Sequence, residues 1–421
     1  MSYVSQDRPM PHLPVETWGT IFQFVEDTTS SRIKLLRVSQ SWRRIATATP
    51  QLWSRLYIHT TNLVPVRFFL KHSRNLPLDM HIRLLDSSAK DTDALTTVLA
   101  EHLSRMRLLE IQISEQELAN KFVARLGHGQ PAPLLESLCI QVDNPSCDPV
   151  RGLALLNSAF RSTPCLARLI LPAYPLPHRS SPLFSSSVLT DLTLDAIPFG
   201  ANTNEYAIFF TIKSVTNLQS ITLKSSASFS YCNTSTFRFP NISTPHLISV
   251  DISAPGWGLH ILDAFHAPLL TSVRLAAPRG HRYRDWTAVY TEAISTSLRL
   301  LSQRSPLVKQ LELCGTVLHH PEEDYRWLFG TAFPLMEVMR FERTDITDAL
   351  MMLGYNCMPG LKTLELSGCK GISGPGLLSF LQTRANKFRL VLEACPHVTE
   401  DAVQALLKVT TLQVDDSRKA G

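Results

Sequence analysis

The sequence predicts an α/β protein: a small N-terminal all-α unit followed by an irregular solenoid, with a parallel sheet on the concave side and helices outside. Three observations predict it. The first sixty residues carry two amphipathic helical patterns and three tryptophans. A short apolar pattern then recurs through the rest of the chain, and helical stretches ending in proline separate its copies.

The 421 residues divide into segments with different expectations. They are a flexible N-terminus at 1–9, the helical unit at 10–56, degenerate first repeats or a connecting region at 57–105, the repeats at 106–416 and a flexible tail at 417–421.

Composition excludes several classes of protein. Hydrophobic residues make up 44% and charged residues 18%, which argues against disorder. The net charge of +5, from 41 basic and 36 acidic residues, is mild for this length, so no nucleic-acid partner is expected. The start lacks an apolar signal, and no apolar run is long enough to span a bilayer. We therefore expect no membrane association and a cytoplasmic and/or nuclear location.

The helical unit is predicted from residue spacing. Pro14 suits a first helical turn, and Trp18 and Phe22 then recur at helical spacing. A polar break follows, with Ser30 as a plausible N-cap, and a second helix is expected over residues 33–46. Two short helices cannot bury three tryptophans by themselves, so either the rest of the chain or another protein covers their apolar faces.

The order of these residues resembles an F-box. The features that carry the resemblance are an opening Leu13-Pro14, a Val38-x-x-x-Trp42 helix and a closing Leu52-Trp53, and it covers about residues 10–56. The resemblance implies binding to a Skp-family adaptor and, through it, to the cullin of a ubiquitin ligase. The residues it implies for the docking face are Leu13, Pro14, Ile21, Phe22, Val25, Leu35 and Val38.

In this interpretation Trp42 and Trp53 brace the helices, and Phe22→Ala is expected to cost about 2 kcal/mol or more of adaptor binding. The alternative is that all these apolar residues form the core of the chain itself.

The repeated cell is apolar-x-x-apolar-x-apolar. Its spacings lie mostly in or near the 20–29 residues of leucine-rich repeats. Twelve copies run from Met106-Leu109-Ile111 to Val409-Leu412-Val414, and residues 56–58 and 80–84 are possible degenerate first strands. The last repeats, with Cys369 and Cys395, look like the cysteine-containing subclass that commonly follows an F-box. These two cysteines are expected under a turn.

The positions between the leucines should face the concave side, because alternate side chains of a strand point to opposite faces. One predicted column is Asp251, Arg274, Glu312, Arg340 and Glu365, and the next is Glu342, Ser367, Glu393 and Asp415. We expect an acidic patch that binds a protein client through a basic or Ser/Thr-rich segment. The alternative is an ordinary solvated sheet.

Catalytic motifs are absent from the sequence: it has no Walker loop, no H-E-x-x-H and no G-x-S-x-G. The eight cysteines include no C-x-x-C pair, so free thiols are expected. Residues 319–324 and 279–286 are interpreted as surface loops. We therefore expect no catalytic residue, no metal, no cofactor and no enzyme activity.

The sequence as a whole favours a substrate-recognition subunit of an SCF-type (Skp–cullin–F-box) ubiquitin ligase, which holds a client for ubiquitination and degradation. The alternative is a leucine-rich-repeat scaffold that acts outside a ligase.

Overall fold

The computed structural model describes residues 13–24, 29–85, 89–144, 153–196, 205–225, 239–254, 256–277, 287–316, 318, 327–328, 332–353, 358, 360–382 and 389–415. The expected flexible ends at 1–9 and 417–421 lie outside these residues, as do the loops at 279–286 and 319–324. The chain forms two compact units. The first comprises residues 1–146, 151–167 and 180–186, and the second the remainder.

The first unit begins with helices and continues as a repeat array. Its helices are α1 (Val15–Gln23), α2 (Thr29–Val38), α3 (Gln40–Ala48), η1 (Pro50–Trp53), α4 (Leu63–His72), α5 (Ala89–Ala100), η2 (Leu103–Arg105), α6 (Gln116–Gly127), α7 (Leu153–Ala159) and η4 (Pro182–Phe184). The single helix expected over residues 33–46 is wrong. Ser39 interrupts it, because its hydroxyl accepts a hydrogen bond from the Trp42 amide and caps α3.

The sheet of the first unit is parallel, with strand order β1-β2-β3-β5. These strands are β1 (Arg55–Ile58), β2 (Leu78–Leu84), β3 (Met106–Glu115) and β5 (Ser137–Asn144), and β4 (Gln130–Pro131) pairs separately with β6 (Phe160–Ser162). The degenerate strands expected at 56–58 and 80–84 are confirmed as β1 and β2. Strand β1 crosses residue 56, where the helical unit was expected to end.

The second unit is a longer array of the same kind, with a parallel sheet running from β7 to β18. Its main strands are β7 (Arg168–Pro172), β8 (Asp191–Asp195), β9 (Ser220–Lys224), β11 (Ser249–Ser253), β13 (Ser272–Ala276), β14 (Gln310–Cys314), β15 (Val338–Glu342), β16 (Thr363–Ser367), β17 (Arg389–Glu393) and β18 (Thr411–Asp415). A small parallel pair joins β10 (Ile242–Ser243) to β12 (Phe265–His266).

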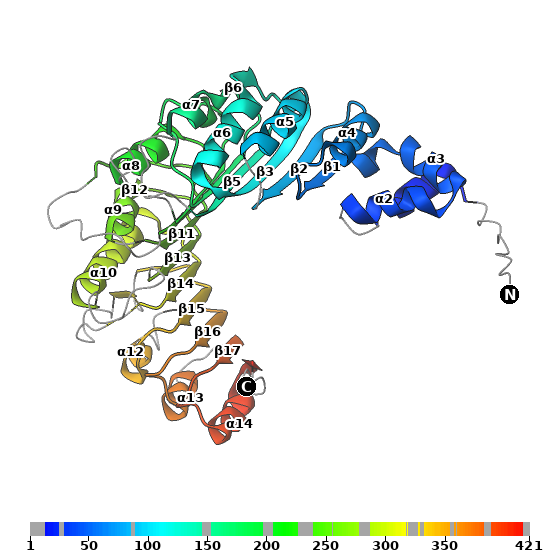
Figure 1. Ribbon diagram of the computed structural model, residues 1–421. Coiled ribbons are helices and arrows are strands. Elements are labelled where there is room, and N and C mark those ends of the chain that lie inside the picture. The colour runs from blue at the N-terminus through cyan, green and yellow to red at the C-terminus, as the bar shows by residue number, and fades with distance from the viewer. Residues whose placement is uncertain are drawn as a thin grey trace, which may run out of the picture. The chain divides into compact units, whose positions relative to one another are not determined.

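Helices cover one face of each sheet (Figure 1). In the first unit α5, α6 and α7 contact one another in succession, as do α12, α13 and α14 in the second. The helices of the second unit are α8 (Glu205–Ser214), α9 (Gly256–Ala264), α10 (Thr287–Arg304), α12 (Asp348–Leu353), α13 (Gly374–Gln382) and α14 (Glu400–Val409). None of the described helices is long and apolar enough to cross a membrane.

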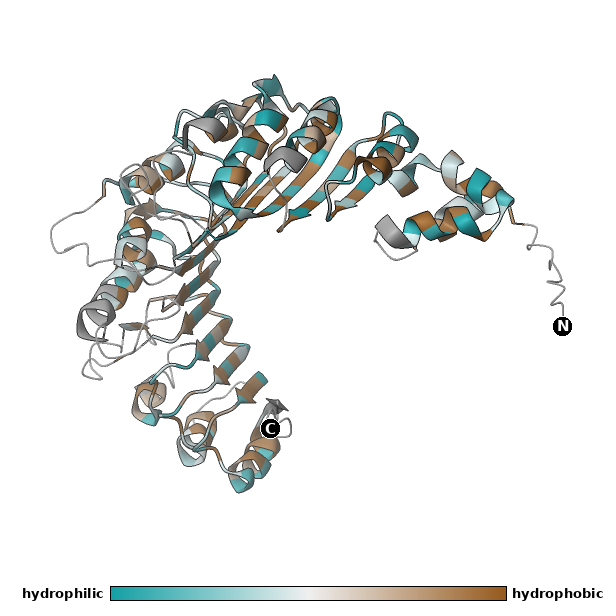
Figure 2. Cartoon of the chain, in the orientation of Figure 1, coloured by the Kyte–Doolittle hydropathy of each residue, from teal (hydrophilic) through white to brown (hydrophobic). Residues whose placement is uncertain are grey.

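The core lies between sheet and helices and is built from the predicted cells. In β14, for example, Leu311 and Leu313 are buried while Glu312 between them faces the other side. Figure 2 shows hydrophobic and hydrophilic residues alternating along the strands. Since each strand pairs in register with the next, the leucines stack repeat upon repeat. The predicted α/β solenoid is confirmed.

The residue after many strands adopts the left-handed conformation. It is Gly315 after β14 and Gly368 after β16, but Arg343 after β15 and Ala394 after β17. At Gly315, Arg343 and Gly368 the backbone amide donates to the last residue of the next strand, as Gly368 does to the Glu393 carbonyl at 2.8 Å. The backbone therefore turns off the sheet in the same way in successive repeats, whichever residue the sequence supplies.

Candidate functional site

The F-box-like helices meet in an aromatic cluster in which Phe22 is buried and Trp18 and Trp42 are half-buried. The ring of Phe22 lies 4.8 Å from that of Trp42 and 6.0 Å from that of Trp18, and the two indoles are 5.7 Å apart. The helices α1 and α3 thus meet through three rings in tilted contact, a favourable arrangement for aromatic side chains. Trp42 braces the helices as predicted.

Burial corrects two of the predicted docking residues. Phe22 is only 1% exposed and Leu35 is buried as well, so both belong to the core of the segment. Both belong to the apolar stripes that the helical spacing predicts, and at these two positions the stripe faces the core. This explains why the apolar pattern selected them. Substitution of Phe22 should therefore report on folding, and its predicted role as a binding anchor stays a prediction.

The other described docking candidates are on the surface. Leu13, Pro14 and Ile21 are exposed, and Val38 is 58% exposed at the end of α2. Val25 lies outside the described residues. The segment thus buries Phe22 and Leu35 and still presents other apolar side chains on its surface.

Sequence reasoning missed Phe24 and Val15 as docking candidates. Phe24, the C-cap of α1, is 85% exposed, and Val15 at the start of the same helix is also exposed. Phe24 follows Phe22 by two residues, so at 100° per residue the two side chains point to roughly opposite sides of the helix. This offset from the Trp18–Phe22 stripe is the sequence feature that could have identified Phe24 as a surface residue.

The helical segment is joined to the first repeat by buried contacts. Trp53 is fully buried, its indole donates to the Ala46 carbonyl at 2.7 Å, and its ring meets Phe68 and Phe69 of α4 edge-on. Arg32 of α2, also buried, donates to the carbonyls of Leu52 at 3.0 Å and Arg55 at 2.7 Å. The bracing role predicted for Trp53 is confirmed, whereas Arg32 was missed because a buried arginine leaves no apolar pattern.

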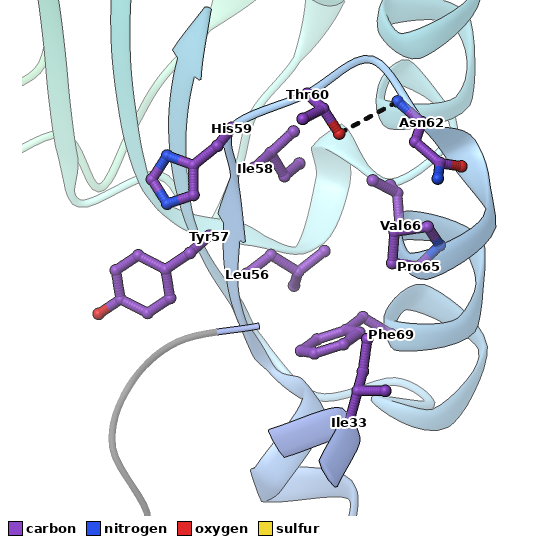
Figure 3. A pocket seen from close by; sticks show the side chains of 10 residues that line it. All are labelled: Ile33, Leu56, Tyr57, Ile58, His59, Thr60, Asn62, Pro65, Val66 and Phe69. Atoms are coloured by element: carbon purple, nitrogen blue, oxygen red, sulfur yellow. Dashed lines mark hydrogen bonds between the residues drawn. The ribbon is translucent and has the colours of Figure 1, made fainter. Parts of the chain in front are cut away.

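A pocket of about 440 Å³ opens at this junction (Figure 3). Its apolar wall combines Ile33 of α2 with Leu56 and Ile58 of β1 and Val66 and Phe69 of α4, and its remaining lining residues are Tyr57, His59, Thr60, Asn62 and Pro65. The pocket requires α2, β1 and α4 together, which lie up to 36 residues apart, from Ile33 to Phe69. No local sequence pattern predicted it.

Both predicted columns of the inner face are present in the second unit. The register aligns Asp251 with Arg274, Arg274 with Glu312, Glu312 with Arg340 and Arg340 with Glu365. The downstream column aligns Cys314 with Glu342, then Ser367, Glu393 and Asp415. Counting positions within the repeated cell was enough to place these residues, because parallel pairing keeps the repeats in register.

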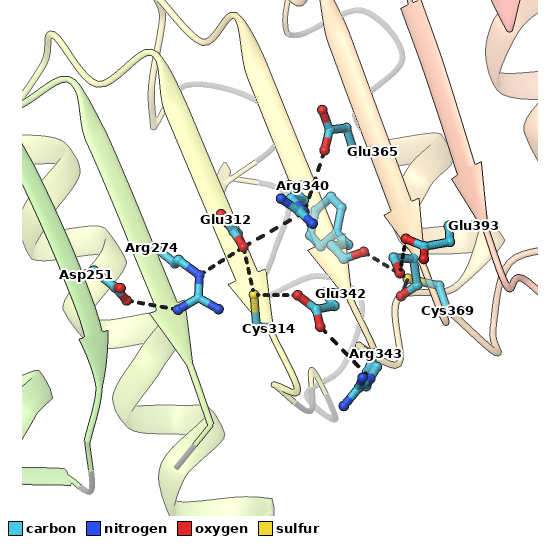
Figure 4. Close-up of polar contacts among 12 residues, drawn as sticks. Asp251, Arg274, Glu312, Cys314, Arg340, Glu342, Arg343, Glu365, Cys369 and Glu393 are labelled. Atoms are coloured by element: carbon cyan, nitrogen blue, oxygen red, sulfur yellow. Dashed lines mark hydrogen bonds and ion pairs between the residues drawn. The ribbon is translucent and has the colours of Figure 1, made fainter. Parts of the chain in front are cut away.

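The first column forms a ladder of ion pairs (Figure 4). Arg274 bridges Asp251 at 3.0 Å and Glu312 at 2.9 Å. Arg340 lies between Glu312 and Glu365, with its Nε 3.9 Å and 3.5 Å from their carboxylates. The acidic patch expected here is largely neutralised by its own arginines.

Acidic character persists in the downstream column. Glu342 contacts only Arg343 at 4.0 Å and the Cys314 thiol at 3.6 Å among its described contacts, and Glu393 accepts from Ser367 at 3.0 Å. No residue of this column is basic, and Arg343 is the cation described beside Glu342, so a cationic ligand would find less competition than at the ladder.

Hydrogen bonding sets the protonation states around Glu312. Burial alone would raise its pKa, but hydrogen bonds from Arg274 and Cys314 and the positive charge of Arg340 outweigh burial and lower the pKa. Burial and the adjacent Glu312 carboxylate raise the pKa of the Cys314 thiol strongly. Glu312, Cys314 and Glu342 have their ligand atoms within 4.8 Å of one another. With a protonated thiol, the trio is a hydrogen-bonded cluster.

The cysteines of the last repeats lie under turns, as predicted. Cys369 and Cys395 are buried, and their Sγ atoms lie 3.4 Å from the Phe341 carbonyl and 3.5 Å from the Leu366 carbonyl. Each sulfur thus contacts the backbone of a preceding repeat, which is a structural role. The cysteines in the described part of the chain are free thiols.

Comparison with known proteins supports the assignment of the N-terminal segment. Residues 10–59 match the family model described as F-box-like. No curated protein matches this chain. Among solved structures, a chain of the yeast Rad7–Elc1 complex is 12% identical, with a TM-score of 0.39, covering 96% of this chain and 94% of that one. A Bacteroides fragilis protein is also 12% identical with a TM-score of 0.39, covering 79% and 84%.

The family match, the three-ring cluster and the register of the leucine cells agree on one description. The chain carries an F-box-like segment at residues 10–59, and a solenoid of leucine-rich repeats follows it.

Proposed function

We propose that this chain is the substrate-recognition subunit of an SCF-type ubiquitin ligase. The observation that carries the proposal is the exposed apolar surface of the F-box-like segment. This adaptor face consists of Leu13, Pro14, Ile21, Phe24 and Val38, all exposed while Phe22 of the same segment is buried. Covering such side chains gains about 25 cal/mol per Å² of apolar area, so a Skp-family adaptor has a physical reason to bind.

The repeats would hold the client. A ligase of this kind gains rate by holding a client lysine near the charged enzyme, which raises its effective concentration. This chain would then contribute binding and position, and no catalytic residue. The client surface we propose is the inner face, with Asp251, Arg274, Glu312, Arg340, Glu342, Glu365 and Glu393, and the intracellular location follows from that role.

Within this face the downstream carboxylates are the better contacts for a basic client segment. The ladder from Asp251 to Glu365 already satisfies its own charges, so a client must displace Arg274 or Arg340 to use it. Glu342 and Glu393 lie two strands apart in one column, about 10 Å, which three residues of an extended chain span.

Co-purification of the full chain with a Skp-family adaptor tests the proposal. We expect Ile21→Gln combined with Val38→Gln to lower the recovered adaptor at least ten-fold, because two apolar contacts are replaced by polar groups. The control is Val64→Gln, since Val64 is 77% exposed on α4, outside the adaptor face. If the wild-type chain recovers no adaptor, or the double variant recovers as much as the control, the scaffold alternative is favoured.

A further inference from the structure

Three consecutive repeats of the second unit expose a leucine at the same position. Leu269, Leu307 and Leu335 each precede the first buried apolar residue of a cell, and they are 47%, 37% and 44% exposed. Single exposed leucines are ordinary on a protein surface. These three form a row, which we call the leucine rim.

The register shows that the row is continuous. Ser272 pairs with Gln310, and Gln310 pairs with Val338. The residues three positions before these strand residues are Leu269, Leu307 and Leu335. Each follows a proline. The turns at Leu269 and Leu335 are closed alike, with the Leu270 amide donating to the Ala267 carbonyl at 3.2 Å and the Met336 amide to the Phe333 carbonyl at 3.1 Å. The rim residues therefore occupy equivalent positions just before three neighbouring strands, which are spaced about 4.8 Å apart.

A charged row runs beside the rim. By the same register, Lys309, Glu337 and Lys362 are equivalent positions in successive repeats. Both lysines approach the one carboxylate, Lys362 at 2.6 Å and Lys309 at 3.6 Å. Two positive charges thus share one negative charge, so this row carries a net positive charge along the edge of the leucines.

We propose that the leucine rim docks an amphipathic α-helix of a partner protein, with acidic residues flanking its apolar stripe. Apolar residues at i, i+4 and i+7 recur about every 5.4 Å along a helix, close to the spacing of the rim. A helix lying across the strands therefore sets one apolar side chain beside each leucine. Acidic residues on one flank then face Lys309 and Lys362. This docking requires neither the adaptor nor the inner face.

A synthetic peptide tests the proposal on the full chain. The probe is a fluorescein-labelled 15-residue helix of alanines, with leucines at positions 4, 8 and 11 and glutamates along one flank. We expect saturable binding by fluorescence anisotropy, and a loss of at least ten-fold in affinity for Leu307→Gln. The matched control is Leu134→Gln, because Leu134 follows Pro133 in the same turn position of the first unit and is 42% exposed.

A second peptide tests the contribution of the charged flank. Replacing the glutamates of the peptide by lysines should weaken binding at low salt, and the difference should shrink as salt is raised. Absence of saturable binding to the wild-type chain, or equal binding by Leu307→Gln and the control, would overturn the proposal.

The other possible occupant is a second copy of this chain. If sedimentation shows a dimer that Leu307→Gln breaks and the peptide does not displace, the rim is a self-interface and the helix proposal is wrong. Adaptor recovery should be unchanged in Leu307→Gln, so failure at the rim and failure at the adaptor face are seen separately.

Discussion

Two phenylalanines two positions apart in α1 have opposite environments. Phe22 is closed in by Trp18 and Trp42, whereas the side chain of Phe24 is almost wholly in solvent. Substitutions at these two phenylalanines can therefore distinguish effects on the folding of the F-box-like segment from effects on its binding. Phe22 contributes to its core, and Phe24 belongs to its adaptor face.

We expect Phe22→Ala to lower the free energy of unfolding by about 3–5 kcal/mol, because it removes a buried ring and leaves a cavity. Phe24→Ala should change it by less than about 0.5 kcal/mol. Urea denaturation of the two variants measures both. Equal stability of the two would show that the three-ring centre contributes little to the fold.

The sequence placed correctly those residues whose position follows from spacing within one repeat. It could not place residues whose burial depends on another helix. The column from Asp251 to Glu365 follows from position within a cell. Which side of α1 faces inward depends on Trp42 of α3, a contact that spacing within α1 cannot show. Phe22 and Leu35 were therefore identified as apolar correctly, and the structure places both in the core of the segment.

At the scale of the strand, the inner-face ladder joins neighbouring repeats by alternating charge. Arg274 ties β11 to β14 through β13, and Arg340 continues the ladder to β16. Partly exposed ion pairs contribute little singly, and more as a network. The ladder is thus one reason for the repeats to stay in register along this face.

Acid should weaken this part of the second unit. The pKa of Glu312 is lower in the folded chain than its ordinary value near 4.5, so its contribution to stability is complete above that pH and is lost as the pH falls through the folded pKa. We expect the wild-type chain to lose more thermal stability than Glu312→Gln between pH 7 and pH 3. Melting curves across this range measure it.

The difference in melting temperature between the wild-type chain and Glu312→Gln could instead stay constant from pH 7 to pH 3. That result would mean that the Glu312 carboxylate has no preferential partners in the folded chain. Raised salt offers a second check, since it should reduce the difference at pH 7 by screening the Arg274 and Arg340 charges.

At the scale of the first unit, the F-box-like segment and the first repeats are one structure. Trp53 needs α4 to cover it, Arg32 links α2 to the start of β1, and β1 needs β2 as its pairing partner. The Asp79 amide of β2 also donates to the Ser54 carbonyl at 3.0 Å, directly before β1. A boundary at residue 56 would cut through these contacts.

A fragment of residues 1–60 should therefore fail to fold cooperatively. It keeps Trp53 but lacks Phe68, Phe69 and β2, so a large apolar ring and a strand edge stay uncovered. Circular dichroism on heating should show a broad, shallow change for the fragment and a sharp transition for the full chain. A sharp transition in the fragment would show that the segment is independent of the repeats.

The sequence by itself determined the repeated cell, the strands, the residues of the inner-face columns and the F-box-like motif, because each depends on spacing along one stretch of chain. Only the tertiary structure decided which apolar side chains of that motif are buried, that Arg274 and Arg340 neutralise the predicted acidic column, and that α2, β1 and α4 enclose a pocket. Those features depend on contacts between distant segments, where side-chain direction and burial, and not residue type, fix the outcome.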